Sequence, residues 1–188
     1  PAYLHMYDVL KGLKKNGTFL LNSIWAPEDI EQHLPNKVKH YLAKNNIRFY
    51  TINATAIAQE IGLGNRTNTI LQSAFFKIAN VIPYDLAVEQ MKKFIVKSYA
   101  KKGDDVVNKN YAAVDRGSEI IEIPVKAEWA NLEDDAPVRH TDDTDFIHDV
   151  VRKVNAQAGD DLPVSAFVGR EDGTWDNGTA ASEKRGVA

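Results

Sequence analysis

The sequence predicts an α/β fold: a layered, mostly parallel sheet with helices on both faces, forming a partial domain, followed by a small α/β appendage. Two observations carry this prediction. Residues 17–53 run as strand, helix and strand with short joins, the pattern of a βαβ unit with parallel, adjacent strands. From residue 124 onward the chain gains prolines and acidic residues, which indicates a linker and a second unit.

The strands of the βαβ unit are recognised by composition. Residues 17–23 are a short apolar run after a turn, and residues 47–53 are rich in aromatic and β-branched side chains. The helix between them has apolar residues three and four apart; Pro35 should interrupt it and residues 45–46 should end it. A third strand is expected within residues 119–125, yet the sheet still lacks elements on its N-terminal side.

Helices follow the second strand. A short helix at 55–61 should break at Gly62 and Gly64, and a longer helix should begin near Asn65 or Arg66. The apolar stripe of this longer helix is the strongest periodic pattern in the chain. It comprises Ile70, Leu71, Ala74, Phe75, Ile78, Ala79 and Ile82. Two more helices are expected, one after the Pro83 stop and one after Gly103.

Three parts are predicted: a domain at 1–123, an extended surface linker at 124–144 and a small unit at 145–188. The small unit should hold a helix at 145–158 and a strand-like segment at 162–168, followed by a loop rich in glycine and polar residues.

Composition narrows the class of protein. The 188 residues are 44% hydrophobic and 26% charged with a net charge of −3, so the chain is globular and lacks the basic excess of a nucleic-acid binder. It has no cysteine, which excludes disulfides and cysteine-ligated clusters from the chain itself. No membrane span or signal peptide is evident, so we expect a cytoplasmic protein without membrane contact.

The Gly62–Asn68 segment is the one candidate binding site. A dinucleotide fingerprint would need a third glycine where Thr67 stands, so a Rossmann dehydrogenase is disfavoured and a glycine hinge between helices is favoured. Gly64, Asn65, Arg66 and Asn68 nevertheless precede or open a helix, where free N–H groups and an arginine favour a phosphate or carboxylate. Pairing of Arg66 with a nearby acid such as Glu60 is the alternative.

No catalytic residue and no metal site are predicted. The five histidines lack metal-ligand spacing, although His33 and His40 are seven residues apart and should share a helix face. They are interpreted as ordinary surface or boundary residues. No nucleophile elbow or phosphate-binding lysine loop is present.

Two separate segments resemble the pyruvate:ferredoxin (flavodoxin) oxidoreductase family. The first comprises Gly-Thr-Phe-Leu-Leu-Asn-Ser-Ile-Trp at 17–25, Phe-Tyr-Thr-Ile-Asn-Ala at 49–54, Ala-Gln-Glu-Ile-Gly-Leu-Gly-Asn-Arg at 58–66 and Ser-Ala-Phe-Phe-Lys at 73–77. It is similar to the C-terminal half of the gamma-like domain. The second, Gly-Thr-Ala-Ala at 178–181 with Glu-Lys-Arg at 183–185, resembles the segment before the ferredoxin-like domain of that family.

The resemblance implies a part of an enzyme that converts pyruvate and coenzyme A to acetyl-CoA and CO2 and passes electrons to ferredoxin or flavodoxin. It implies thiamine diphosphate and [4Fe-4S] clusters in the full enzyme, which we expect to be a homodimer, with no cofactor bound by this chain. Gly64, Asn65, Arg66 and Asn68 are the residues expected to face coenzyme A or a neighbouring domain. Lys184 and Arg185 are expected in interdomain packing.

The chain starts at Pro1 without Met and ends without a capped element, so we expect an excised segment that is inactive by itself. The alternative from another class is a free-standing α/β module that binds a partner protein or a nucleotide without redox activity.

Overall fold

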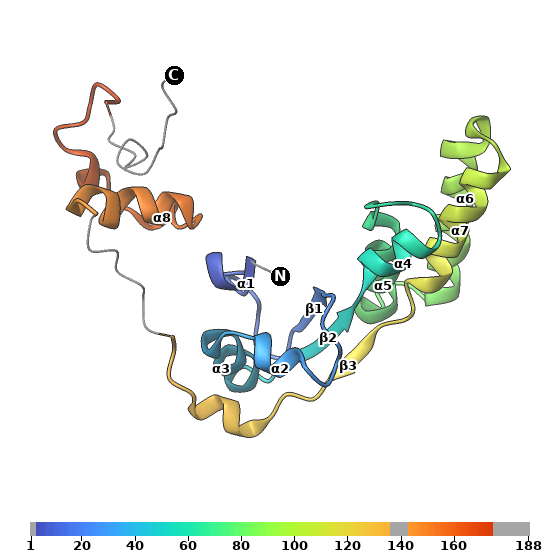
Figure 1. The fold of residues 1–188 in the computed structure, drawn as a ribbon, viewed down its shortest axis with the longest axis horizontal. Helices are drawn as coiled ribbons and strands as arrows, with labels where there is room; N and C mark the ends of the chain where they lie inside the picture. The colour runs from blue at the N-terminus through green and yellow to red at the C-terminus, as the bar shows by residue number, and fades with distance from the viewer. Residues whose placement is uncertain (1–2, 136–142, 175–188) are drawn as a thin grey trace, which may run out of the picture. The chain divides into compact units, whose positions relative to one another are not determined.

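The structure, a computed structural model, describes residues 3–135 and 143–174 (Figure 1). These residues form two compact units. One comprises residues 10–134, and the other combines residues 3–9 with 135 and 143–174. The first unit contains the sheet, and the second has helices and turns as the only regular elements among its described residues.

The sheet has three strands in the order β1-β2-β3. Strand β1 (Thr18–Asn22) runs parallel to β2 (Arg48–Ile52), with Thr18 opposite Arg48, and confirms the predicted βαβ unit. Strand β3 (Ile121–Ile123) lies where a third strand was expected but runs antiparallel to β2. The α/β fold class is confirmed, and the sheet is mixed, with one parallel and one antiparallel strand pair.

The crossover between β1 and β2 consists of two helices. Helix α2 (Ile30–His33) ends before Pro35, and α3 (Asn36–Lys44) begins after it, because proline fits the start of a helix but not its interior. Asn45 caps α3 at its C-terminus, and Asn46 takes a φ of 51°, a left-handed conformation that asparagine tolerates and that turns the chain into β2.

Helix α4 (Ala54–Glu60) starts at the carboxyl ends of the two parallel strands. The Asn53 side chain accepts a hydrogen bond from the Ala56 amide at 3.0 Å, and Asn22 at the end of β1 accepts one from the Ala54 amide, also at 3.0 Å. This strand edge is a common ligand position in open α/β sheets. Here the two asparagines anchor a helix instead.

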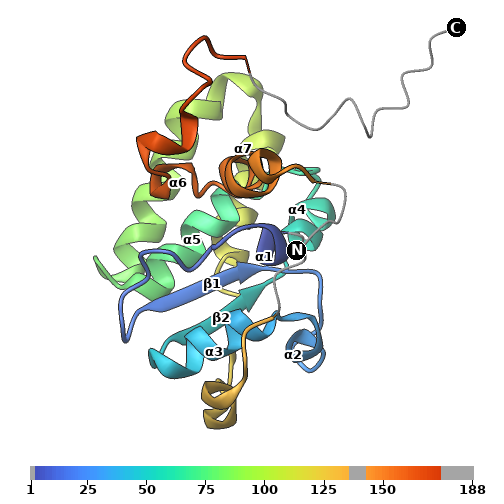
Figure 2. The same cartoon turned by 90° about the vertical axis from the view of Figure 1, so that its left-hand side faces the viewer.

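Helices α5 (Asn68–Ala79), α6 (Tyr84–Tyr99) and α7 (Asp104–Arg116) follow, with a 3₁₀ turn at Ala100–Lys102 before α7. Figure 2 shows α2 and α3 on one side of the strands and α4 to α7 on the other. The main core cluster lies on the α4–α7 side. It comprises Ile52, Ala54, Ile57, Ala58, Leu63, Ile70, Ala74 and Ala113.

Helix α5 departs from its sequence prediction in two ways. It begins at Asn68, later than the predicted Asn65 or Arg66, because the turn before it continues through Arg66, whose amide donates to the Leu63 carbonyl oxygen. Its buried face is also rotated: Ser73 is fully buried, whereas Phe75 is 52% exposed. The apolar stripe predicted the helix correctly, but the buried face of the helix includes a polar residue, Ser73.

Helices α5 and α7 approach closely at Gly117. A Cβ atom there would lie 2.4 Å from Ser73 Cβ and 2.6 Å from the Ile70 carbonyl oxygen, well inside van der Waals contact. Gly117 has an ordinary helical φ of −62°, so space rather than conformation requires glycine. The Ser73 hydroxyl donates to the Val114 carbonyl oxygen at 2.6 Å and so ties the two helices together.

The start of the predicted linker is not extended. Residues Ala127–Asn131 form a 3₁₀ turn that packs on α3, and Trp129 is only 3% exposed. Its indole Nε1 donates to Glu31 Oε1 at 3.0 Å, and Lys126 Nζ lies 2.6 Å from Glu31 Oε2. A buried tryptophan with a partner for its N–H overrides the loop-like composition of this segment.

The second unit differs from its prediction. Its helices are α1 (Tyr3–Met6), a π-helical turn (Ile147–Val151) continuing into α8 (Arg152–Asn155), and 3₁₀ turns at Gly159–Asp161 and Val164–Phe167. The predicted helix is thus shorter, and the strand-like segment at 162–168 is a 3₁₀ turn. Within the described ranges, no helix is long and apolar enough to cross a membrane.

Gly117→Ala is expected to lower the free energy of unfolding of the first unit by about 1–3 kcal/mol, because the new methyl group meets α5 backbone and Ser73. Urea unfolding followed by circular dichroism measures the change. Asn108→Ala, at an exposed position of the same helix α7, is the matched control, and its effect should stay within about 0.5 kcal/mol. Equal effects of the two variants would contradict the close crossing.

The Glu31 contacts should make the Trp129 environment pH-sensitive. Hydrogen bonds from Lys126 and Trp129 hold the pKa of Glu31 below its ordinary value of 4.5. Stabilisation from a lowered pKa is present above the ordinary value and is lost as pH falls through the folded one. With Trp25→Phe and Trp175→Phe leaving Trp129 as the sole tryptophan, its fluorescence should therefore change below pH 4.5. Glu31→Gln should remove this step; a step that persists would assign it elsewhere.

Candidate functional site

The turn between α4 and α5, residues 61–67, has a fixed conformation. Gly62 has a φ of +75° and Gly64 a φ of +61°, conformations that favour glycine. Leu63 between them is buried in the main core cluster, and its amide donates to the Ala58 carbonyl oxygen at 2.8 Å. The turn is therefore anchored at Leu63.

The structure brings the four predicted site residues together. Gly64, Asn65, Arg66 and Asn68 are all exposed and lie within five consecutive positions. Thr67 caps α5 without a side-chain hydrogen bond, so the first-turn amides of this 12-residue helix lack the acceptor that a capping side chain would provide. Such amides, with the partial positive charge of a helix N-terminus, favour an anionic group.

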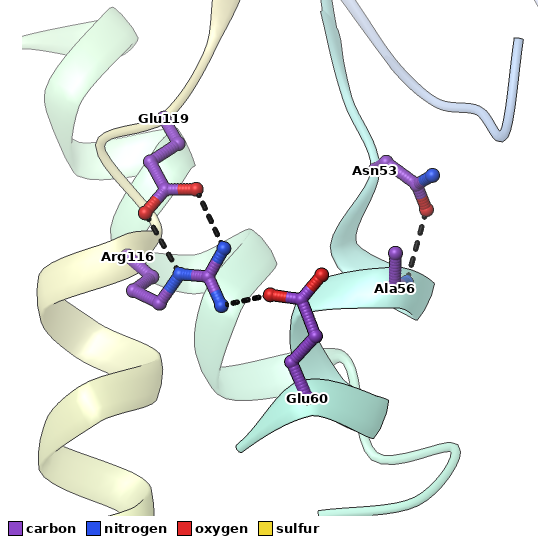
Figure 3. A network of polar contacts seen from close by, with 5 residues as sticks. All are labelled: Asn53, Ala56, Glu60, Arg116 and Glu119. Carbon is purple, nitrogen blue, oxygen red and sulfur yellow. Dashed lines mark hydrogen bonds and ion pairs between the residues drawn. The ribbon is translucent and has the colours of Figure 1, made fainter.

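Arg66 does not pair with Glu60, the alternative that the sequence left open. Glu60 Oε2 instead accepts from Arg116 Nη1 at 2.5 Å (Figure 3). Within the described residues, no hydrogen bond or ion pair involves the Arg66 guanidinium. With respect to the described residues, the five N–H donors of Arg66 are therefore open to an anion from outside.

Arg116 links three elements behind the turn. It binds Glu119, ahead of β3, through Nε to Oε1 at 2.8 Å and Nη2 to Oε2 at 3.0 Å, and Glu60 at the end of α4 through Nη1 (Figure 3). The hydrogen bonds that Arg116 donates to Glu119 and then to Glu60 raise the pKa of Arg116, and the bond from Arg116 lowers the pKa of Glu119. This network holds the end of α4, from which the turn departs.

A hollow of about 220 Å³ lies between α5 and α6 and reaches Asn68. It is lined by Asn68, Thr69, Gln72, Met91, Phe94, Ile95, Ser98 and Tyr99. Asn68 was predicted from the sequence as a site residue, but none of the α6 residues was. The antiparallel packing of two consecutive helices could have paired them, because the start of α5 then faces the end of α6.

The other predicted positions contribute no further site. His33 stacks on Trp25 at 4.6 Å, on α2, whereas His40 lies on α3 with its Nδ1 3.2 Å from Asp134, so the two do not share one helix face. Across residues 3–135 and 143–174, no group of three or more His, Cys, Asp or Glu could hold a metal ion. Lys184 and Arg185 lie outside the described residues.

Two family models match the chain. One, described as pyruvate ferredoxin/flavodoxin oxidoreductase, matches residues 1–120. The other, EKR, a domain of unknown function, matches residues 133–188. These ranges include the two segments on which the resemblance in the sequence rests, in the same order.

Curated relatives match along the whole chain. The pyruvate:ferredoxin oxidoreductase of Moorella thermoacetica is 49% identical and the pyruvate-flavodoxin oxidoreductase of Klebsiella pneumoniae 48%, each over 100% of this chain. The pyruvate dehydrogenase [NADP(+)] of Cryptosporidium parvum is 40% identical, also over 100% of the chain. The chain spans 16% of the length of the first two relatives and 11% of the third.

Proposed function

Because this chain belongs to the pyruvate ferredoxin/flavodoxin oxidoreductase family, we propose that it is one part of an enzyme that converts pyruvate and coenzyme A to acetyl-CoA and CO2. The full enzyme, a homodimer on this proposal, passes electrons to ferredoxin or flavodoxin. The first unit supplies scaffold and, at residues 64–68, a surface that faces coenzyme A.

One observation carries the proposal: two family segments follow each other along one chain, and relatives named for this reaction match all of it at 48–49% identity. In these relatives the matching stretch is a small share of a longer polypeptide. This favours a part of a larger enzyme over a free-standing interaction or nucleotide-binding module.

The residues of this chain do not fit the redox cofactors of the proposed enzyme. A [4Fe-4S] cluster needs thiolate ligands, and the 188 residues include no cysteine. The family resemblance implies that the full enzyme also uses thiamine diphosphate. On this proposal both cofactors are held by the remaining domains of the enzyme, and this chain takes no electron-transfer step.

The choice of electron acceptor also lies outside this stretch. The names of the relatives include ferredoxin, flavodoxin and NADP(+), yet all match this chain throughout. This chain is still 40% identical to a relative whose name gives NADP(+) as the acceptor. Because all of these names include pyruvate, the chain is better suited to the half-reaction that consumes pyruvate than to the one that reduces the acceptor. This supports a role on the substrate side.

The exposed turn suits the phosphate groups of coenzyme A. Arg66 offers a planar fork that binds phosphate through two parallel hydrogen bonds, and the uncapped amides of α5 add donors beside it. The positive φ of Gly64 shapes the backbone ahead of this arginine, and Asn68 opens the helix. Together they would hold and orient an anionic group without taking part in bond making.

Arg66→Lys in the full-length enzyme should raise the Michaelis constant for coenzyme A by roughly 5- to 150-fold, the equivalent of about 1–3 kcal/mol for a lost charged hydrogen bond. Lysine keeps the charge but loses the fork. Steady-state kinetics with coenzyme A as the varied substrate measures the effect. Arg48→Lys, on an exposed arginine that donates to Thr18, is the control and should leave this constant unchanged. If Arg66→Lys leaves the Michaelis constant for coenzyme A unchanged, residues 64–68 do not bind an anionic group of coenzyme A.

The purified 188-residue chain should remain colourless after incubation with iron and sulfide, with no band at about 400 nm, because it lacks thiolate ligands. It should also fail to reduce viologen in the presence of pyruvate and coenzyme A. Visible absorbance and the viologen assay test both points, with the intact enzyme as the positive control. A cluster band or turnover by this chain alone would contradict the assignment of the cofactors to other domains.

A further inference from the structure

The hollow between α5 and α6 has the size of a site for one side chain. Its volume is about 220 Å³, whereas cavities for whole small ligands are typically about 300–1,000 Å³. Asn68, Thr69 and Gln72 form the α5 wall, which is polar, and α6 contributes Phe94 and Ile95 among other residues. A mixed wall of this kind suits a large apolar side chain with polar backbone beside it.

One exposed phenyl ring lines this hollow, and a second lies one helical turn further along α5. Phe94 lines it and is 63% exposed, and Phe75, three residues beyond Gln72 on the same row of α5, is 52% exposed. Soluble proteins bury most of their large aromatic side chains, and exposed clusters of them usually mark interaction surfaces. The two rings therefore indicate that this face is covered in the assembled protein.

The last turn of α6 and the 3₁₀ turn that follows it, both beside the hollow, carry three lysines. Lys97, Lys101 and Lys102 flank the lining residues Ser98 and Tyr99, and Lys102 Nζ lies 5.4 Å from the centre of the Tyr99 ring. Over the part of the chain that the structure describes, none of these three lysines forms an ion pair. In contrast, two lysines earlier in α6 are paired, Lys92 with Asp115 and Lys93 with Glu89. The unpaired charge favours an acidic occupant.

We propose that the α5–α6 hollow receives a segment of the same enzyme polypeptide from outside these 188 residues, which presents a large apolar side chain flanked by carboxylates. The inference rests on the proposed function, in which this chain is one part of a longer enzyme. More than four fifths of the length of the matched relatives lies outside the stretch described here, so potential occupants are covalently attached. Attachment raises the effective concentration of the segment, so a single-residue anchor is sufficient.

Photo-crosslinking in the intact enzyme tests this proposal. Phe94→p-benzoylphenylalanine keeps an aromatic ring at the hollow and reacts on illumination with whatever lies against it. The expected product is an intramolecular crosslink to a peptide that contains Asp or Glu and lies outside these 188 residues, identified by mass spectrometry. Its band keeps the mass of one polypeptide on a denaturing gel.

The control is Val96→p-benzoylphenylalanine. Val96 is also exposed, at 42%, and lies on α6 but does not line the hollow. It should give at least fivefold less of the same crosslinked peptide. A crosslink from position 94 to a second copy of the chain, to a separate protein or only to residues 1–188 would overturn the proposal, as would equal yields at the two positions.

A second variant tests the charge independently. Lys101→Glu combined with Lys102→Glu should lower the melting temperature of the intact enzyme by several degrees at low salt and less at high salt, since salt screens charge pairs at the surface. No shift, or a shift independent of salt, counts against an acidic occupant. Neither test uses coenzyme A, so their failure is distinguishable from failure of the substrate-side role, which the Arg66→Lys kinetics addresses.

Discussion

The crossing of α5 and α7 at Gly117 determines where the rest of the first unit lies. The absence of a Cβ atom at Gly117 lets the Ser73 hydroxyl reach the Val114 carbonyl oxygen at 2.6 Å. Residue 116, one position earlier, is the arginine that binds Glu60 and Glu119. A shift of α7 would thus move the end of α4, the start of the turn that carries Arg66 and the approach to β3.

Local sequence patterns predicted most elements of this unit, because short-range chemistry decides them. Pro35 separates two helices, and Gly62 and Gly64 form the turn that separates α4 from α5. Each of these residues acts through its own backbone preference. Long-range contacts decided what the patterns missed. The antiparallel direction of β3 depends on the path of α7, and the 3₁₀ turn at Ala127–Asn131 depends on Trp129 reaching Glu31, 98 positions earlier.

The candidate site was predicted in part for the same reason. The turn at 64–68 is contiguous in sequence, so its glycines and Arg66 could be identified without a structure. The ion pair of Glu60 could not be identified in this way, because its partner Arg116 lies 56 positions away. The α6 wall of the neighbouring hollow was missed because Phe94 fits an apolar stripe equally well whether it is buried or exposed. Family membership, inferred from motif order, is confirmed by the matches along the whole chain.

Strand β1 has a neighbouring strand on one side only, since the described sheet runs β1-β2-β3. Its outer edge presents backbone N–H and C=O groups that no further strand of the described sheet satisfies, and such edges recruit strands from other chains. Recombinant production of these residues by themselves should for this reason favour low temperature, dilute handling and a solubility partner fused ahead of β1. The same edge offers a defined point at which an added strand could extend the sheet and convert the unit into a self-contained domain.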